Sequence, residues 1–355
     1  MTGTTVAVVL ACGFLCGLAA WACAATRRRR RPHLARREAA VRSALYQSFD
    51  DPEPGRILDG LGASERKLLE TKARALLPTL RGEDRETLAR LLESRGATRA
   101  ARRQCRSRRA TSRAAACRML GDVGSSFAVL DLVPLLEDPR PAVRMAAARA
   151  LGRLGQPAGV VPLMGSVSGR KALPLDVAAD AIQQIRDWPV SLLHPCLADP
   201  SEPTRALAVE LLGRFQALDS VGALIEILER DPSTIVRVRA ARALGRIDSP
   251  HAVQSLMRCV HLGPGELRVE AVRALGRLGA TAAVPTLRVT LLGPSLQLSQ
   301  AAAASLSAIV PRGVEVLQEI AGDHLHPAAS IARRALAAEA ALAAGLLPEP
   351  SVPVG

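Results

Sequence analysis

The sequence is poor in aromatic residues: it has two Trp, one Tyr and four Phe in 355 residues, although 48% of the chain is apolar. The apolar fraction is therefore mainly Ala, Leu and Val, a mixture that favours helices over sandwiches and barrels. So few rings also argue against a cleft lined by aromatic side chains. The composition predicts an all-α protein that is long enough for one large or two ordinary domains.

Motifs for metal binding or catalysis are also lacking. The seven Cys and six His form no CxxC motif and no Cys/His cluster, and no phosphate-binding glycine loop occurs. His324-x-His326 and His194-Pro195-Cys196 are interpreted as turns, not as a metal site or a nucleophile pair. The cysteines beyond the N-terminal stretch are scattered, which is typical of buried thiols and not of disulfides: Cys105, Cys117, Cys196 and Cys259. The sequence predicts no catalytic residue, no cofactor, no metal and no enzyme activity.

Acidic residues are missing from two short arginine-rich segments. The formal net charge is +14, and residues 27–37 hold seven Arg while residues 95–113 hold eight. The rest of the chain is nearly neutral, so nucleic acid is not expected as a partner. Three interpretations of 95–113 remain open: contact with anionic lipid headgroups, contact with an acidic partner, or a solvated face.

The first 26 residues carry no charged side chain. Residues 5–25, as a helix, would just span a hydrocarbon core of about 30 Å. Residues 1–26 are therefore predicted to be a transmembrane anchor, although Ala22-Cys23-Ala24 would also suit the cleavage site of a signal peptide. Five consecutive arginines follow and would resist translocation: Arg27, Arg28, Arg29, Arg30 and Arg31. The positive-inside rule then predicts a single-pass protein of the cell membrane, with its N-terminus outside and everything after residue 27 in the cytoplasm.

One short phrase returns along the chain with a period of about 31 residues, which indicates a solenoid of stacked units. Its clearest copies are Ala150-Leu151-Gly152-Arg153-Leu154, Leu211-Leu212-Gly213-Arg214-Phe215, Ala243-Leu244-Gly245-Arg246-Ile247 and Ala274-Leu275-Gly276-Arg277-Leu278. Apolar residues before each phrase recur at helical spacing, and the Gly is expected to end or tighten that helix. A second helix is predicted to start near Val161, Val221, Val253 and Val284.

An Asp six residues before an Arg precedes several copies of the phrase, as Asp138/Arg144, Asp199/Arg205 and Asp231/Arg237; Arg268 holds the same Arg position. With the phrase, this pattern resembles bacterial HEAT repeats, particularly the short type found in phycobilin lyase subunits. The resemblance implies a right-handed α-α superhelix of the HEAT/armadillo-like kind, in which these Asp and Arg form a hydrogen-bonded ladder between units. Units around Gln183 and Ser307 depart from the pattern.

The predicted organisation has five parts. They are a transmembrane anchor (1–26), a basic juxtamembrane linker (27–60), a helical N-terminal capping unit (61–110), a solenoid of about eight units (111–345) and a disordered tail (346–355). In the capping unit, helices are expected over 64–80, with Ser64 as the cap, and over 83–94.

These features favour a non-catalytic, membrane-tethered scaffold that binds an unidentified protein partner. Two alternatives rest on resemblance alone: a phycobilin-lyase-like enzyme or enzyme accessory subunit, and a HEAT-like alkylpurine DNA glycosylase. The latter class stacks bases on aromatic residues and works in a basic groove, neither of which residues 114–355 suggest.

Overall fold

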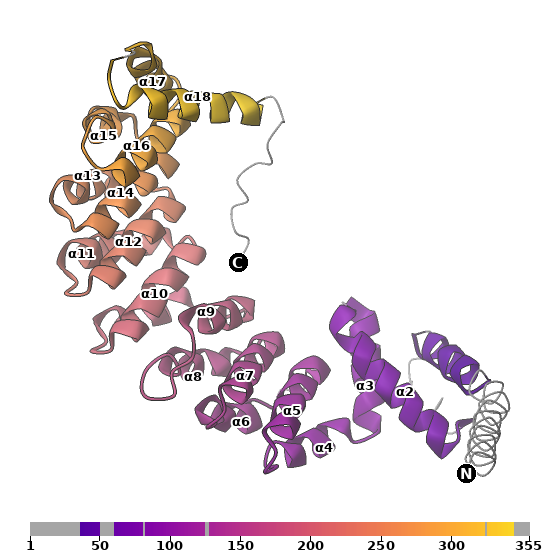
Figure 1. Cartoon of the computed structure of the whole chain (residues 1–355). Coiled ribbons are helices and arrows are strands. Elements are labelled where there is room, and N and C mark those ends of the chain that lie inside the picture. Colours follow the sequence, from indigo (N-terminus) through magenta and orange to yellow (C-terminus); the bar gives the residue numbers. More distant parts are fainter. Residues whose placement is uncertain (1–35, 50–59, 81, 125–127, 324, 344–355) are drawn as a thin grey trace, which may run out of the picture. The chain divides into compact units, whose positions relative to one another are not determined.

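The computed structural model describes residues 36–49, 60–80, 82–124, 128–323 and 325–343 (Figure 1). Within these ranges the chain forms helices and connecting turns and contains no strand, as the composition predicted. It divides into two compact units, residues 1–128 and 129–355, so the division falls inside the stretch that was predicted as the solenoid.

The predicted anchor, 1–26, and the arginines Arg27–Arg31 lie outside the described residues. Among the helices that are described, none combines the length and the apolarity that a membrane span requires.

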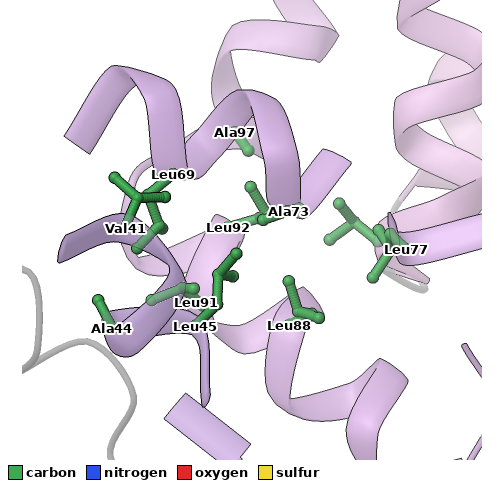
Figure 2. Close-up of a cluster of buried hydrophobic side chains, with 11 residues drawn as sticks. Val41, Ala44, Leu45, Leu69, Ala73, Leu77, Leu88, Leu91, Leu92 and Ala97 are labelled. Carbon is green, nitrogen blue, oxygen red and sulfur yellow. The ribbon is translucent and has the colours of Figure 1, made fainter. Parts of the chain in front are cut away.

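The first unit is a small helical domain. Its elements are a helix over 36–49, α2 (Ala63–Leu76), the 3-10 turn η2 (Leu77–Thr79), α3 (Gly82–Ser94), α4 (Ala97–Gln104) and α5 (Ala110–Val123). Its core is almost entirely aliphatic, as Figure 2 shows, with Leu69 and Ala73 of α2 facing Leu88, Leu91 and Leu92 of α3. Burial of such side chains is the main favourable term for a unit that has no disulfide among its described residues.

The helix over 36–49 lies within the segment that was predicted as a linker. Val41, Ala44 and Leu45 are buried in the core of the first unit, at the i, i+3 and i+4 spacing of a helix face. The seven arginines of 27–37 dominate the local sequence, so the apolar spacing that follows them was not interpreted as a helix. The structured part of the first unit therefore begins before residue 60.

The start of α2 also differs from its prediction. The helix begins at Ala63, and the residue before it is Gly62, whose backbone N–H donates to Oε2 of Glu65 at 2.9 Å. The cap residue is therefore Gly62, with Glu65 reaching back to it, and not Ser64. At the other end of the unit, Nη2 of Arg85 donates to the carbonyl oxygen of Asp122 at 2.8 Å and ties α3 to the end of α5.

The second unit is a stack of helices in two layers. Figure 1 shows α10, α12, α14 and α16 side by side, with α11, α13, α15 and α17 beside them on one side. Its α-helices are α6 (Val129–Leu132), α7 (Pro141–Leu154), α8 (Val160–Gly165), α9 (Leu175–Gln184), α10 (Glu202–Arg214), α11 (Val221–Arg230), α12 (Thr234–Ile247), α13 (Val253–Leu262), α14 (Gly265–Arg277), α15 (Val284–Leu291), α16 (Leu296–Ala308), α17 (Arg312–Gly322) and α18 (Ala329–Ala343). We call α10, α12, α14 and α16 the first layer and α11, α13, α15 and α17 the second layer.

The helix starts that were predicted for the second helix of each repeat are confirmed, because α8, α11, α13 and α15 begin at or next to the expected valines. One unit departs from the pattern, as its sequence indicated. After α9 the chain makes two short 3-10 turns, Val190–Leu193 and Pro195–Ala198, in place of a second helix. Pro195 removes a backbone donor in the middle of that stretch.

The glycine of the repeated phrase has a steric role. It does not end its helix: Gly152 and Gly245 lie inside α7 and α12. A Cβ placed on Gly245 would lie 2.9 Å from Cα of Ala274, in the next helix of the layer. The same clash would occur between Gly152 and Ala181, Gly213 and Ala243, and Gly276 and Ser305. The glycine therefore lets the backbone of the next helix come close. The residue of that helix that packs against the glycine is the Ala of the following phrase, or Ser305 in its degenerate copy.

Leucine supplies the core of each interface in the first layer. We call the glycine of the repeated phrase the marker glycine, and its place in each repeat the marker position. The Leu that precedes each marker glycine is fully buried, at Leu151, Leu212, Leu244 and Leu275. In the phrase Ala-Leu-Gly, the Ala packs against the glycine of the previous helix and the Leu fills the core. The Gly, which lacks a side chain, leaves room for the next helix.

Gln183 and Ser307 occupy the marker position in irregular units. The amide oxygen of Gln183 accepts a hydrogen bond from Nη1 of Arg214 at 3.1 Å. Ser307 lines a cavity of about 570 Å³ between α16 and α18, together with Ala303, Ala304 and Ala335. Small residues therefore line most of this cavity, and α16 and α18 still contact each other beside it.

We expect Gly245→Ala to lower the free energy of unfolding by about 1–3 kcal/mol, because the new methyl group meets the backbone of Ala274 and the close contact must open. This cost opposes the gain of about 1 kcal/mol that alanine normally brings to a helix interior. Chemical denaturation followed by circular dichroism measures the difference.

Gly222→Ala is the matched control, since Gly222 lies in α11 and a Cβ placed on it would have nothing within 4 Å. It should be neutral or slightly stabilising. Equal stability of the two variants would contradict the steric role of Gly245.

Candidate functional site

The three Asp-Pro turns of the second unit are closed by the Asp side chains. Oδ1 of Asp138, Asp199 and Asp231 accepts from the backbone N–H two residues later, at 2.9, 2.7 and 2.8 Å. Each of those N–H groups belongs to the residue just before α7, α10 or α12. The aspartates therefore fix how the chain enters the first helix of each repeat.

The arginine six residues later folds back onto the same turn. Nη1 of Arg144 donates to the backbone carbonyl of Asp138 at 3.0 Å, and Nη1 of Arg205 donates to that of Asp199 at 2.9 Å. The other side of the Arg205 guanidinium reaches the next unit, where Nε and Nη2 bind the carboxylate of Asp231 at 2.8 and 3.1 Å. A planar guanidinium and a carboxylate make such a two-point contact with good geometry.

The other arginines of the predicted ladder bind different partners. Nε of Arg237 donates to the carbonyl of Leu228, and Nε of Arg268 donates to that of Val260, both at 2.8 Å. These carbonyls lie in the last turns of α11 and α13, where cations are favourable. The position that corresponds to Asp231 in the next unit lies six residues before Arg268. It holds Leu262, which is 85% exposed, so Arg237 has no carboxylate to bind there.

A second set of polar contacts connects α9, α10 and α12. Glu210 of α10 is 4% exposed. Its carboxylate pairs with Nε of Arg214 in the same helix at 3.0 Å. It also pairs with two arginines of α12, with Nη1 of Arg246 at 2.8 Å and with Nη1 of Arg239 at 3.2 Å. Arg214 also reaches back to Asp180 of α9 at 2.6 Å. One buried carboxylate thus joins two successive repeats.

Glu270 repeats this arrangement between α12 and α14. It is 3% exposed, and both of its oxygens accept from Arg242 of the previous repeat at 3.3 Å. Nη2 of Arg277 binds Glu270 at 2.8 Å, and Nη1 of Arg273 lies 3.8 Å away. We call the six arginines around these two carboxylates the arginine ridge: Arg214, Arg239, Arg242, Arg246, Arg273 and Arg277.

The arginines set the charge state of the two glutamates. Burial raises the pKa of Glu210, but hydrogen bonds from Arg246 and Arg214 outweigh burial and lower the pKa to about 2. Burial also raises the pKa of Glu270, and Arg242 and Arg277 reverse the effect, so the net shift is downward. Both carboxylates are therefore charged at neutral pH.

The sequence contained a signal for this network that was not recognised. Arg214, Arg246 and Arg277 each directly follow the marker glycine of the repeated phrase. They were counted as part of the repeat and not as a charged surface. Glu210 and Glu270 gave a weaker signal, because they hold different repeat positions and an acid recurs only at the position of Glu210, as Asp180.

Cysteine and histidine side chains make isolated contacts. Cys105, Cys117 and Cys259 are buried and Cys196 is half-buried, and burial raises the pKa of the Cys259 thiol. His194 pairs through Nε2 with Oγ of Ser220 at 2.8 Å, not with Cys196. His324 lies outside the described residues. In the ranges that the structure describes, no group of three His, Cys, Asp or Glu side chains could hold a metal ion.

The second arginine-rich segment, 95–113, lies in the first unit. Arg99 and Arg103 are exposed on α4, and Arg106, Arg108 and Arg109 are exposed in the turn that follows. The opposite face of α4 is small and apolar, with Ala97 and Ala101 buried. The helix therefore presents a basic face to solvent.

Paired helices stacked in two layers, each joined mainly to its sequence neighbours, define the second unit as an α-solenoid. The family profile for HEAT repeats matches residues 100–183 and 190–266, and the profile for the PBS lyase HEAT-like repeat matches residues 267–292. The chain contains a HEAT-repeat domain.

Solved structures with similar folds include human deoxyhypusine hydroxylase, with 21% identity over 87% of this chain and 98% of that chain (TM-score 0.31). Yeast importin-β has 14% identity over 81% of this chain and 47% of its own (TM-score 0.48). A phycocyanin lyase complex from a Nostoc species has 21% identity over 70% of this chain and 92% of that chain (TM-score 0.28). No curated protein matches the sequence. At these TM-scores the likeness carries no argument about function.

We expect Glu210→Gln to lower the free energy of unfolding at neutral pH by about 3 kcal/mol, since a pKa of about 2 in the folded chain lies well below that of an unfolded glutamate. A lowered folded-state pKa stabilises the protein above the unfolded pKa. The contribution is lost as pH falls from about 4.5 towards 2. The stability gap between wild type and variant should therefore close over that range, as measured by denaturation at a series of pH values.

Glu226→Gln is the control, because Glu226 is 67% exposed and paired only with the exposed Arg230. Its stability should follow that of the wild type at every pH. A constant gap for Glu210→Gln between neutral and acidic pH would show that the carboxylate charge is not what stabilises the repeat interface.

Proposed function

We propose that the chain is a bacterial, membrane-tethered HEAT-repeat scaffold that binds a partner protein at the cytoplasmic face of the membrane and performs no chemistry itself. In this proposal residues 1–26 are a single-pass anchor with the N-terminus outside, and Arg27–Arg31 hold that orientation. The right-handed superhelix is part of the same proposal.

The observation that carries the scaffold function is the stack α10–α12–α14–α16. Because each glycine admits the next helix, exposed side chains from successive repeats lie on one continuous surface. Solenoids use such extended surfaces to bind other macromolecules, and variation between repeats determines which partner fits.

The basic face of α4 supports a position close to a membrane. Basic side chains near anionic headgroups gain about 1 kcal/mol each, and the face carries several of them without an acid in residues 95–113. This contact would be independent of residues 1–26.

The match of residues 267–292 to the PBS lyase HEAT-like repeat favours one alternative, an accessory subunit of a bilin-attaching enzyme. The two functions differ in a direct assay. Covalent attachment of a bilin to an acceptor protein that depends on the purified chain, alone or with a catalytic subunit, would support the alternative and contradict the scaffold.

The scaffold proposal predicts that the full chain stays with membranes after alkaline carbonate washing and that a version lacking residues 1–26 does not. A reporter fused after Gly355 should be active in the cytoplasm. From detergent-solubilised membranes, the tagged full chain should recover a specific partner protein in a fixed ratio. Activity of the reporter only outside the cytoplasm, or a mature N-terminus near Ala25, would overturn the topology.

The chain lacking residues 1–26 is expected to bind vesicles of anionic lipid at low salt and to release them as ionic strength rises, because screening shortens the interaction. Arg99→Gln/Arg103→Gln/Arg106→Gln should reduce this binding in a sedimentation assay. The control Arg230→Gln/Arg258→Gln/Arg288→Gln removes the same charge from the second layer of the solenoid. Equal losses in both triple variants would favour a solvated face on α4.

A further inference from the structure

The arginine ridge holds more positive charge than its own carboxylates neutralise. Its six guanidinium groups contact Glu210, Glu270 and Asp180, which leaves an excess of three positive charges. Each guanidinium has five N–H donors, whereas a carboxylate offers about four acceptor positions. The ridge is therefore rich in both charge and donors.

The second layer does not share this property. Three of its four arginines each face a single carboxylate, and the fourth, Arg312, begins α17: Arg230 faces Glu226, Arg258 faces Glu229 and Arg288 faces Glu319. These pairs are neutral and mostly exposed. The excess charge is thus a feature of one face of the solenoid and not of the repeat itself.

The ridge arginines are also held in place before any partner binds. The carboxylates of Glu210 and Glu270 lie beneath them, nearly inaccessible to solvent, while the arginine side chains range from 17% exposed at Arg214 to 54% at Arg273. Long side chains usually lose rotamer freedom on binding, and fixing them in advance reduces that loss.

The ridge has defined ends. Arg242 of α12 and Arg273 of α14 lie three residues before the marker position. Arg246 of α12 and Arg277 of α14 lie one residue after it. The same two positions on α16 are Ala304 and Ala308. On the other side, Asp180 of α9 meets Arg214. The six ridge arginines therefore come from α10, α12 and α14, and arginine holds both positions again on α7, as Arg149 and Arg153.

We propose that the arginine ridge is the docking surface for an acidic segment of the partner protein, a chain rich in Asp or Glu that lies across α10, α12 and α14. This inference rests on the proposed scaffold function and specifies the chemistry of its partner. Carboxylates of the segment would accept from guanidinium groups that Glu210 and Glu270 orient from below. The excess of three charges would be neutralised on binding.

Nucleic acid is the competing polyanion, and the ridge is less suited to it. Binding of single strands uses rings on which bases stack, and α12 and α14 contain no aromatic residue. Phe215, which follows α10, packs edge-on against Trp188 with 5.6 Å between ring centroids. Its ring is engaged within the solenoid.

The test measures the affinity of the full chain, in an uncharged detergent, for a short fluorescein-labelled peptide in which glutamate alternates with serine. Arg239→Gln/Arg273→Gln removes one arginine from each buried glutamate and leaves each with two others. We expect binding by fluorescence anisotropy to weaken about tenfold, with unchanged circular dichroism. Arg258→Gln/Arg288→Gln removes the same charge from the second layer and should change the affinity less than about twofold.

A variant that is expected to raise the affinity for the peptide tests whether the ridge charge itself binds the peptide or the arginines only stabilise the fold. Ala304 is exposed on α16, and Ala304→Arg would extend the ridge by one repeat, so affinity for the peptide should rise about threefold. Val289→Arg adds the same charge on α15, where Val289 is 65% exposed, and should leave the affinity unchanged.

Three results would overturn the proposal: equal weakening in both double-Gln variants, equal strengthening by Ala304→Arg and Val289→Arg, or tighter binding of a single-stranded oligonucleotide that matches the peptide in charge. Recovery of the same membrane partner by wild type and by Arg239→Gln/Arg273→Gln would also exclude the ridge as the docking surface, while the scaffold function would stand. Failure of the wild type to recover any partner would instead contradict the scaffold function, whatever the peptide does.

Discussion

The close contact between a glycine in one helix and a small residue in the next is the constraint on which the solenoid depends. A hydrogen at Gly213, Gly245 or Gly276 allows the backbone of the following helix to pass at a distance that no other residue permits. This spacing places Leu side chains in a continuous core and brings arginines within reach of carboxylates in the neighbouring repeat. Sterics at one position thereby set both the packing and the electrostatics of the first layer.

The two layers use charge differently. Glu210 and Glu270 lose hydration when they are buried, and several arginines offset that cost. Such pairs tie the register of one repeat to the next, because a shifted helix would leave a buried carboxylate without its donors. Exposed pairs of the second layer, such as Arg230 with Glu226, contribute little to stability. The first layer is therefore fixed more firmly than the second.

Much of the fold followed from sequence periodicity. The phrase Ala-Leu-Gly-Arg predicted the helices of the solenoid, and the second helices begin at or next to the valines that were expected to start them. The helix over 36–49 was missed because a dense run of arginines masked the weaker spacing of Val41, Ala44 and Leu45. The glycine was expected to end or tighten its helix, as glycines near helix ends usually do. Its contact with a residue about 30 positions later cannot be read from local sequence.

The sequence alone determined that the protein is helical and repetitive, that several units carry an Asp-Pro turn, and that two arginine-rich segments precede the clearest copies of the repeat. These properties depend on neighbours within a few residues, where helix period and turn chemistry act. Only the tertiary structure decided which arginines share a carboxylate. Arg205 meets Asp231, and Arg246 meets Glu210, across 26 and 36 residues. Such pairs depend on how closely two helices approach, and that distance is set by packing between repeats and not by any single stretch of sequence.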